Sequence, residues 1–483
     1  MWIEVTASDQ IRLNCKRLGS EPALSLGGLG PDIISYERLG YHVDAVSARL
    51  QHLGVVPGLI YGVHYEAPVT HVVLILALER LGAVSATVRD EADCNAIELA
   101  GVFSDRRFAG TRCRVTLVTG DWLFADPELA VPATRAVTPD QLCRISFTSG
   151  STGRPKPVVL TYGMRAERAR NQDLAYGAAL GGATRRLCSI GINTGFGYRM
   201  LVRTLCDGGL FCFPDGDVPR TARRIQMYGV QGLMGSPLQL ADLASHGQAN
   251  PGAFSSLKFT LCIGSRLSDA LAEKLRRHVC SLVMVSYGSS EGGIAAAGSV
   301  EDLDLLRGDV GRVIASVQVE ILDEAGRPRV GSVGRIRIKS DGVAYPSIGD
   351  GTLPDANFDG DWFYPGDIGM LSADGMLSIL GREDNVVNVG GVKTTSEKIE
   401  AELLAGPGVS DVAVIAMADR TGISRITAFV VPRNDWSEVA FSEYCGSRLN
   451  ATIRPVKIYL LRELPRTPNG KVDRQALPAL IPT

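Results

Sequence analysis

"ISFTSGSTGRPKPVVL", residues 145–160, is an apolar run that changes abruptly into hydroxyls and glycines, then closes on Lys156 and a second apolar run. The two apolar runs predict strands, and the segment between them offers hydroxyls and backbone amides that could surround a phosphate. It is not a Walker loop, because Lys156 follows Pro155 rather than glycine and no Ser or Thr comes after it. From composition alone, a solvated Gly/Ser loop fits the stretch equally well.

The composition limits the class of protein. A chain of 483 residues, 45% of them hydrophobic, is longer than one core usually spans, so we expect two or three subdomains. The 50 Lys and Arg residues nearly cancel the 52 Asp and Glu residues, which gives no sign of a nucleic-acid or membrane-surface partner. The ten cysteines show no CxxC pair and no zinc spacing, so they predict reduced thiols.

Targeting and membrane segments are not evident in the sequence. The N-terminus is too polar for a signal peptide, and Glu79 and Arg80 interrupt the longest apolar stretch. The sequence therefore predicts a cytoplasmic protein, a monomer or homodimer, that acts on a small molecule.

Helical and strand patterns alternate before about residue 310. Residues 36–54 have helical periodicity, residues 55–67 resemble a strand after a Pro-Gly turn, and residues 70–88 predict a buried helix that leads to a strand. Short β-rich runs from about residue 311 predict an antiparallel or barrel-like unit, and residues 396–432 predict a small α+β domain. We predict an α/β fold: a large N-terminal region of helix-flanked β-sheets, a β-barrel-like unit and a small α+β C-terminal domain.

Four later stretches accompany the opening one. They are "YGSSEGG" at 287–293, "DWFYPGDIGML" at 361–371, "GREDNVVNVGGVK" at 381–393 and "PRTPNGKVDRQAL" at 465–477. In order and spacing, the five stretches resemble the motifs of the adenylate-forming superfamily of acyl-CoA synthetases, peptide-synthetase adenylation domains and firefly luciferase. The resemblance covers nearly the whole chain. It implies an ATP- and Mg²⁺-dependent ligase that converts a carboxylic acid to an acyl-adenylate with release of pyrophosphate, and then transfers the acyl group to a thiol.

The resemblance implies a nucleotide site. Its residues are the phosphate loop Thr148, Ser149, Gly150, Ser151, Thr152, Gly153 and Lys156, the adenine-side Gly264, Ser265, Ser286, Tyr287, Gly288 and Ile379, the phosphate-contacting Ser290, and the ribose-side Asp367 and Arg382. Glu291 matches the magnesium ligand, a role for which one carboxylate and phosphate oxygens suffice. Pro157 and Arg266 depart from the family pattern. Taken alone, Glu291 could be a solvated loop carboxylate and Asp367 a turn residue.

The last two motifs imply a moving domain. Asp384 matches the hinge between an N-terminal domain, 1–383, and a mobile C-terminal domain, 384–483. Gly391 matches the glycine of a tunnel for a pantetheine arm, so coenzyme A or a phosphopantetheine carrier is the expected acceptor. Lys471 matches the lysine that stabilises charge during adenylation and joins Glu291 and Lys156 as a catalytic residue. A lone Lys after Asn-Gly could also be a solvated turn residue.

The segment before Gly208 bears on which carboxylic acid is the substrate. Amino-acid-activating members carry Asp where this chain has Gly195, which disfavours an α-amino acid. Asn193 stands where aryl- and acyl-CoA ligases often carry His and hydroxybenzoate-activating members carry Asn. Phe196 could stack on a flat acid, with room beside it at Gly195 and Gly197. The expected substrate-binding residues are therefore Asn193, Phe196, Gly197 and Gly288, with an aromatic or unsaturated acid as substrate, although Asn193 could instead only hold its loop.

Two alternatives remain at this point. The enzyme could pass the activated acid, possibly an unusual small acid, to an amine or another non-thiol nucleophile. A nucleotide-binding protein without catalysis would be expected to lack Lys471, Glu291 or Asp367, and all three are present. A biosynthetic ligase is the expected role.

Overall fold

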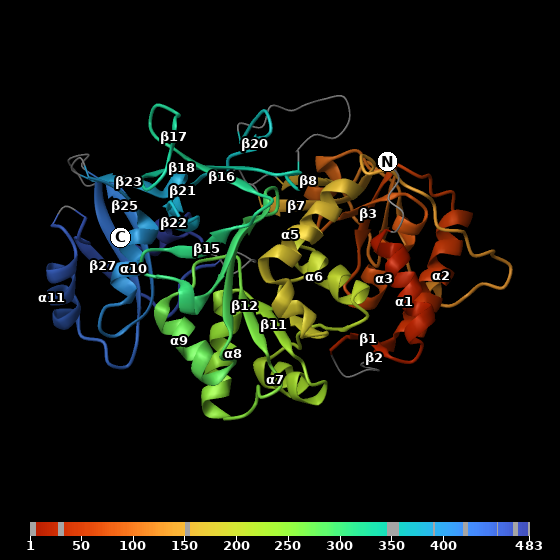
Figure 1. The fold of residues 1–483 in the computed structure, drawn as a ribbon, viewed down its shortest axis with the longest axis horizontal. Coiled ribbons are helices and arrows are strands. Elements are labelled where there is room, and N and C mark those ends of the chain that lie inside the picture. The colour runs from red at the N-terminus through yellow and green to blue at the C-terminus, as the bar shows by residue number, and fades with distance from the viewer. Residues whose placement is uncertain are drawn as a thin grey trace.

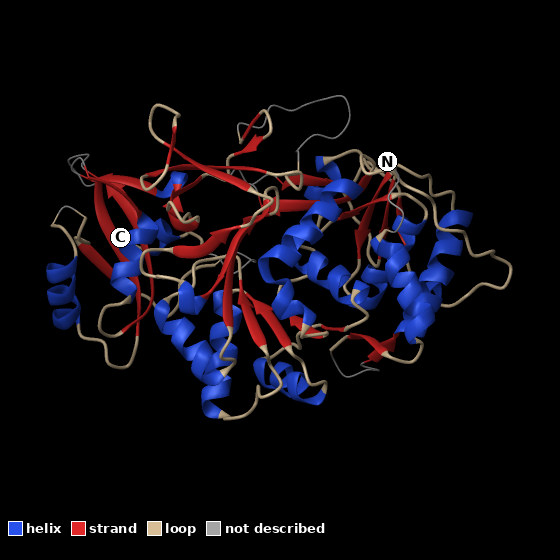
Figure 2. Cartoon of the chain, in the orientation of Figure 1, coloured by secondary structure: helices blue, strands red, loops and turns tan. Residues whose placement is uncertain are grey.

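The computed structural model describes residues 6–27, 33–149, 155–344, 357–389, 392–418, 424–451, 453–466 and 472–481. The molecule is elongated in the view of Figure 1, with the first helices at one end and the C-terminal elements at the other. Helices cover the sheets of the N-terminal region, as Figure 2 shows, so the expected helix-flanked sheets are present.

The first sheet has six strands and ends in the hairpin of the opening motif. Its order is β6 (Val115–Leu117), β5 (Gly101–Ser104), β3 (Ile60–His64), β4 (Val84–Thr87), β7 (Leu142–Ser149) and β8 (Pro155–Thr161). All pairs are parallel except β7 with β8. The predicted helices are α2 (Tyr36–His52) and α3 (Pro68–Arg80), and α4 (Glu91–Ala96) follows β4. Residues 70–80 of α3 are all buried, as its lack of a polar face predicts.

The second sheet begins with mainly parallel strands. Their order is β2 (Ile33–Ser35), β1 (Pro22–Ser25), β10 (Leu210–Cys212), β9 (Arg185–Cys188), β11 (Gly232–Gly235), β12 (Phe259–Cys262), β13 (Val283–Ser289) and β14 (Gly293–Ser299). The helices of this part of the chain are α1 (Ala7–Leu18), α5 (Tyr162–Gly181), α6 (Gly195–Cys206), α7 (Val218–Met227), α8 (Pro237–Ala249) and α9 (Asp269–His278). The β-strands change from parallel to antiparallel at β13–β14, where the Glu291 motif forms the turn.

Antiparallel strands continue this sheet, as expected from residue 311 onward. They are β15 (Asp309–Val313), β16 (Gln318–Leu322), β17 (Pro328–Arg329), β18 (Val333–Lys339), β19 (Phe358–Asp359), β20 (Trp362–Phe363), β21 (Asp367–Leu371) and β22 (Met376–Arg382). Pairing of β14 with β15 and of β15 with β22 joins them to the parallel strands. The motif on β21 that is predicted to bind ribose thereby lies in the same sheet as the Glu291 motif.

A small C-terminal domain with its own core follows β22. It contains β23 (Val386–Val389), β24 (Val392–Thr395), α10 (Ser396–Leu404), β25 (Val409–Ala418), β26 (Ser424–Pro432), α11 (Glu438–Arg448) and β27 (Lys457–Leu460). Its buried apolar cluster includes Ile399, Val414 and Phe441 and no residue before Val387. The predicted α+β domain is confirmed.

The cysteines and the helices bear on two further points. Disulfides join none of the ten cysteines, all of which lie in described parts of the chain. The search of the described residues finds no helix with the length and apolar character needed to cross a membrane.

Candidate active site

The phosphate motif forms the β7–β8 hairpin at the edge of the six-stranded sheet. Antiparallel pairing sets Lys156 opposite Thr148, and Pro157 opposite Phe147. Pro157 lies on the edge strand β8, where proline is tolerated in a sheet. Lys156 is partly buried, so the hairpin holds a cation beside the loop that the sequence predicts for phosphate. Gly150, Ser151, Thr152 and Gly153, and the side chains of Thr148 and Ser149, lie outside the described residues.

Three motif residues meet at the predicted ribose site. Asp367 on β21 pairs directly with Arg382 on β22, whose Nη1 lies 3.2 Å from Oδ1 of Asp367. The Tyr287 hydroxyl, from β13, donates a 2.5 Å hydrogen bond to Oδ2 of the same carboxylate. Burial, and then the charge of Asp367, raise the pKa of Tyr287 well above its ordinary value. The phenol therefore stays protonated and remains a donor, and the carboxylate is held from both sides.

Glu291 lies in the turn between β13 and β14. Its backbone carbonyl accepts hydrogen bonds from Arg168 Nη2 at 2.6 Å and from the Ala344 amide at 2.8 Å. Its partly buried carboxylate has no hydrogen bond or ion pair to the residues that the structure describes, so both oxygens can accept a cation. Among the described residues, no group of three or more His, Cys, Asp or Glu side chains could hold a metal. This donor set fits Mg²⁺, which can take one carboxylate and keep phosphate and water oxygens.

The remaining adenine-side residues flank this turn. Ser286 and Ser290 are partly buried, and Gly288 is constrained because a Cβ there would meet the Gly293 carbonyl oxygen at 2.1 Å. Gly264 and Ser265 are exposed in the loop after β12, where Gly264 has a φ of 91°. Ile379 is partly buried on β22, and its amide donates to the Gly308 carbonyl at 2.8 Å. The unusual Arg266 donates to the backbone carbonyls of Leu305 and Leu306, which gives it a structural role.

The predicted acid side begins at α6. Thr194 caps this helix by accepting the Gly197 amide proton at 3.1 Å, which leaves Asn193 exposed just before the first turn. Phe196 is partly buried on that turn. A Cβ at Gly197 would lie 2.2 Å from the Gly191 carbonyl oxygen, whereas one at Gly195 would meet nothing within 4 Å. The expectation of room for substrate at Gly197 is therefore corrected: its missing side chain lets the helix pack on the loop, and the open space lies at Gly195.

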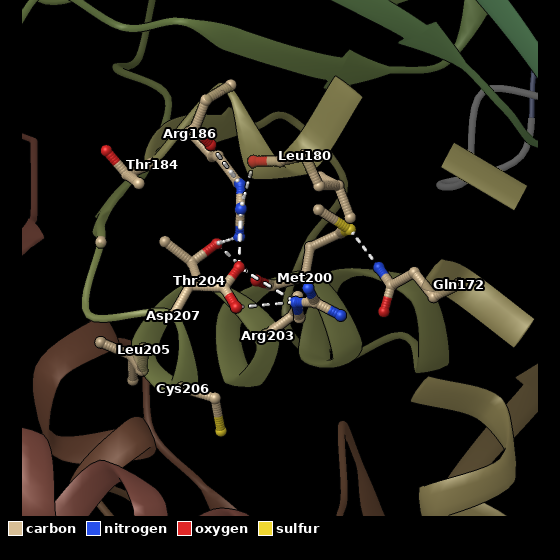
Figure 3. A network of polar contacts seen from close by, with 12 residues as sticks. Gln172, Leu180, Thr184, Arg186, Met200, Arg203, Thr204, Leu205, Cys206 and Asp207 are labelled. Atoms are coloured by element: carbon tan, nitrogen blue, oxygen red, sulfur yellow. Dashed lines mark hydrogen bonds and ion pairs between the residues drawn. The ribbon is translucent and has the colours of Figure 1, made fainter. Parts of the chain in front are cut away.

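A polar network anchors α6 to its neighbours (Figure 3). Arg186 on β9 and Arg203 on α6 both bind Asp207, at 2.7 and 2.9 Å. On the other side, Gln172 on α5 donates to the Met200 sulfur at 2.7 Å. These contacts join the middle and the C-terminal end of α6 to β9 and α5.

The last motifs lie at and beyond the domain boundary. Asp384 is exposed in a 3₁₀ turn (Glu383–Asn385) between β22 and β23, 3.6 Å from Arg382 Nη2. Gly391 and Lys471 lie outside the described residues. After Lys471, Arg474 binds Glu400 on α10 through both carboxylate oxygens, at 2.7 and 2.6 Å. The segment that follows Lys471, residues 472–481, is thus joined to α10.

Two buried arginines in this region were not predicted from any motif. Arg165 and Arg168 lie on the buried stripe of α5 with Tyr162 and Asn171, at helical spacing. Arg165 binds Glu79 on α3 at 2.7 Å, and Arg168 reaches the Glu291 turn. The signal available in the sequence was that these arginines recur at the three-residue spacing of one helix face, the face that α5 buries.

Known proteins match the chain at the level of the whole fold. The family model of AMP-binding enzymes matches residues 12–345, and that of the AMP-binding enzyme C-terminal domain matches residues 398–471. The AMB antimetabolite synthetase AmbB of Pseudomonas aeruginosa is 28% identical over 478 residues, which are 92% of this chain and 37% of that protein. The 3-hydroxybenzoate–CoA/4-hydroxybenzoate–CoA ligase of Thauera aromatica is 25% identical over 364 residues, 73% of this chain and 69% of that protein. The chain thus spans less than half the length of the first of these relatives.

Solved structures have the same fold. The amide bond synthetase McbA from Marinactinospora thermotolerans has a TM-score of 0.80 at 22% identity, over 98% of this chain and 99% of that one. The O-succinylbenzoate coenzyme A synthetase MenE from Bacillus subtilis, in complex with ATP and a magnesium ion, has a TM-score of 0.81 at 21% identity, over 97% and 99%.

Proposed function

The chain belongs to the family of AMP-binding enzymes, adenylate-forming ligases of carboxylic acids, and we propose from this premise that it joins an acid to a thiol in two steps. First, a carboxylate oxygen attacks the α-phosphorus of ATP, the bond to the bridging oxygen breaks, and pyrophosphate leaves. Then a thiolate attacks the carbonyl carbon of the acyl-adenylate, and AMP leaves with the electron pair of the C–O bond. The acceptor is coenzyme A or a carrier protein.

The geometry at Asp367 is the observation that carries this proposal. A ribose presents two neighbouring hydroxyls, and a single carboxylate can accept from both with its two oxygens. Tyr287 and Arg382 fix that carboxylate in the sheet that also holds the Glu291 turn. This arrangement supports the nucleotide roles proposed for Tyr287, Asp367 and Arg382.

Charge on the phosphates is the second requirement. We assign Lys156 and the loop before it to the β- and γ-phosphates, where a fixed cation stabilises the leaving pyrophosphate. Glu291 is the residue that would hold Mg²⁺, which when bound supplies Lewis-acid stabilisation of phosphate charge. Lys471 has the same electrostatic role at the reacting carboxylate and α-phosphate.

The C-terminal domain serves both steps in this proposal. Asp384, exposed between β22 and β23, is the hinge, with domains at 1–383 and 384–483, and Gly391 lines the path of the thiol. A rotation there would withdraw Lys471 and bring Gly391 to the site between the half-reactions. Large rotations of this kind are absorbed by a few residues at the ends of elements.

An aromatic or unsaturated acid is the proposed substrate. Phe196 and the open side of Gly195 offer a flat surface with space beside it, and Asn193 presents an amide at the same helix end. The relative from Thauera aromatica, a hydroxybenzoate–CoA ligase, is consistent with this choice. Gly288, on β13, is assigned to the same acid-binding site.

Product analysis tests the proposal. The purified chain is incubated with ATP, Mg²⁺ and a panel of aryl, cinnamyl, fatty and amino acids, and acyl-adenylates are measured by mass spectrometry. Coenzyme A, a phosphopantetheinylated carrier or a primary amine is then added in separate arms. We expect adenylates of aryl or cinnamyl acids, and we expect these adenylates to be consumed when coenzyme A or the carrier is added. Consumption by the amine alone would overturn the proposed acceptor.

A further inference from the structure

Arg168 on α5 and Arg199 on α6 have no acidic partner among the residues that the structure describes. Arg168 is 2% exposed, and its guanidinium donates only to backbone carbonyls, at 2.7 Å to Gly342 and 2.6 Å to Glu291. Arg199 makes no hydrogen bond or ion pair to any described residue, and its Nε atom is buried without a partner. The Phe196 ring lies near Arg199, with its centroid 5.8 Å from Cζ.

Two other arginines of these helices are paired with carboxylates, unlike Arg199. Arg165 binds Glu79, and Arg203 binds Asp207. Burial, and then the charge of Arg199, lower the pKa of Arg168 to about 9, and burial lowers the pKa of Arg199. A buried guanidinium without a hydrogen-bonding or ionic partner, such as that of Arg199, is unfavourable unless an anion binds it.

Space for an anion lies directly beside Arg199. A cavity of about 340 Å³ lies between α5, α6 and the start of α1. Its lining includes Gln172, Tyr198 and Arg199, together with the ion-paired Arg165, Arg203 and Asp207. Arg199 therefore faces this cavity while it contacts Phe196, the residue assigned to the acid. Arg168 links the same region to the Glu291 turn.

We propose that the acid activated by this enzyme is a dicarboxylic acid, and that Arg199 binds its distal carboxylate while the other carboxylate is adenylated. This inference rests on the proposed function and narrows its substrate class. A guanidinium presents parallel N–H donors that match the two oxygens of a carboxylate, which makes such pairs strong and selective. Arg199 is thus a specificity-determining residue that contacts substrate.

The test compares two diacids, terephthalate and isophthalate, each with its monoamide, which has nearly the same shape and one negative charge fewer. Acid-dependent pyrophosphate exchange is measured for the wild type, Arg199→Met and Arg199→Lys. Arg170→Met is the matched control, because Arg170 is an exposed arginine on α5. Binding of the same four acids is measured by calorimetry without ATP.

We expect the wild type to prefer at least one diacid over its monoamide by about tenfold or more. Arg199→Met should reduce that preference to near unity, Arg199→Lys should retain part of it, and Arg170→Met should leave it unchanged. Equal losses for diacid and monoamide in Arg199→Met, or no preference in the wild type, would overturn the inference. If no acid supports exchange, the proposed function fails, and calorimetry then decides the role of Arg199. Tighter binding of a diacid than of its monoamide, lost in Arg199→Met and kept in Arg170→Met, would still support a carboxylate contact of Arg199. Equal binding of diacid and monoamide by the wild type would overturn it.

Discussion

The Tyr287 hydroxyl and the Asp367 carboxylate, 80 positions apart in the chain, form a 2.5 Å hydrogen bond. The bond joins the strand that precedes the Glu291 turn to the strand that carries the ribose motif. Because the pKa of Tyr287 is raised by burial and by Asp367, the phenol remains a neutral donor over the working pH range. The contact positions one carboxylate oxygen, and Arg382 positions the other.

Replacing Tyr287 with Phe should weaken ATP use. Loss of a hydrogen bond to a charged group typically costs about 1.5 to 3 kcal/mol, so kcat/KM for ATP should fall at least about tenfold while KM for the acid changes little. Steady-state kinetics with varied ATP measure this effect. Tyr41→Phe is the control, since Tyr41 is an exposed phenol that accepts only the Ala125 amide proton. Equal ATP kinetics in Tyr287→Phe and the wild type would refute the positioning role.

Asn193→Ala tests the acid side. If the amide bonds a ring substituent or the carboxylate, its removal leaves that group unpaired at a cost of about 1 to 3 kcal/mol, while ATP binding barely changes. Pyrophosphate exchange is compared for a hydroxy-substituted aryl acid and its unsubstituted parent. If Asn193 contacts the ring substituent, Asn193→Ala should reduce the preference of exchange for the hydroxy acid over its parent. If Asn193 contacts the carboxylate, exchange should fall equally for both acids. If neither acid is affected, Asn193 only shapes the loop.

Asp384→Pro should separate the two half-reactions. Proline fixes φ and should trap one orientation of the C-terminal domain, so adenylation should survive while thioester formation fails. Both steps are followed in single-turnover experiments, with Asp384→Ala as a control that keeps the backbone free to rotate. Thioester formation at the wild-type rate in Asp384→Pro would show that the pivot lies elsewhere.

Glu400 should make the stability of the C-terminal domain depend on pH. Burial, partly offset by Arg474, raises the pKa of Glu400 from its ordinary value of 4.5 to about 7. Between these two values the folded chain binds more protons than the unfolded chain, so this contribution to stability falls as pH rises from about 4.5 to 7. The loss is on the order of 1 to 3 kcal/mol.

Thermal unfolding at pH 5 and pH 7.5 measures this dependence. The difference between the two melting temperatures should be smaller in Glu400→Gln than in the wild type. Glu402→Gln, at an exposed position on the same helix, should keep the wild-type difference. Identical pH dependence in Glu400→Gln and the wild type would contradict the role of Glu400.

Local patterns predicted most of the fold. The helical periodicity of α2 and the apolar runs of α3, β25 and β26 were sufficient, because each element displays in its own sequence the apolar residues that it buries. The pairing of β21 with β22 and of β13 with β14 could not be predicted from periodicity. Partner strands are chosen by contacts between distant parts of the chain.

The candidate site, like the fold, could be predicted only in part from local sequence. Residues in motifs, such as Asp367 and Tyr287, were named from the sequence, but their mutual hydrogen bond depends on the sheet order. Gly197 was misjudged because the loop carbonyl that occupies its side comes from Gly191, across a turn. The sequence gives no sign of Arg199, because its lack of a partner among the described residues depends on how distant side chains are placed around it.

The central claim is adenylation of an acid with Lys471 in the proposed catalytic role, and acid-dependent exchange of labelled pyrophosphate into ATP tests it most directly. Exchange requires that an acid attack the α-phosphate and that the step reverse, so it reports adenylation without any acceptor. We predict exchange that depends on an added acid and falls at least about a hundredfold in Lys471→Ala, because a preorganised cation at the developing charge is lost. Transfer from a supplied acyl-adenylate should be largely retained in that variant. ATP binding without exchange for any acid in the panel would contradict the account.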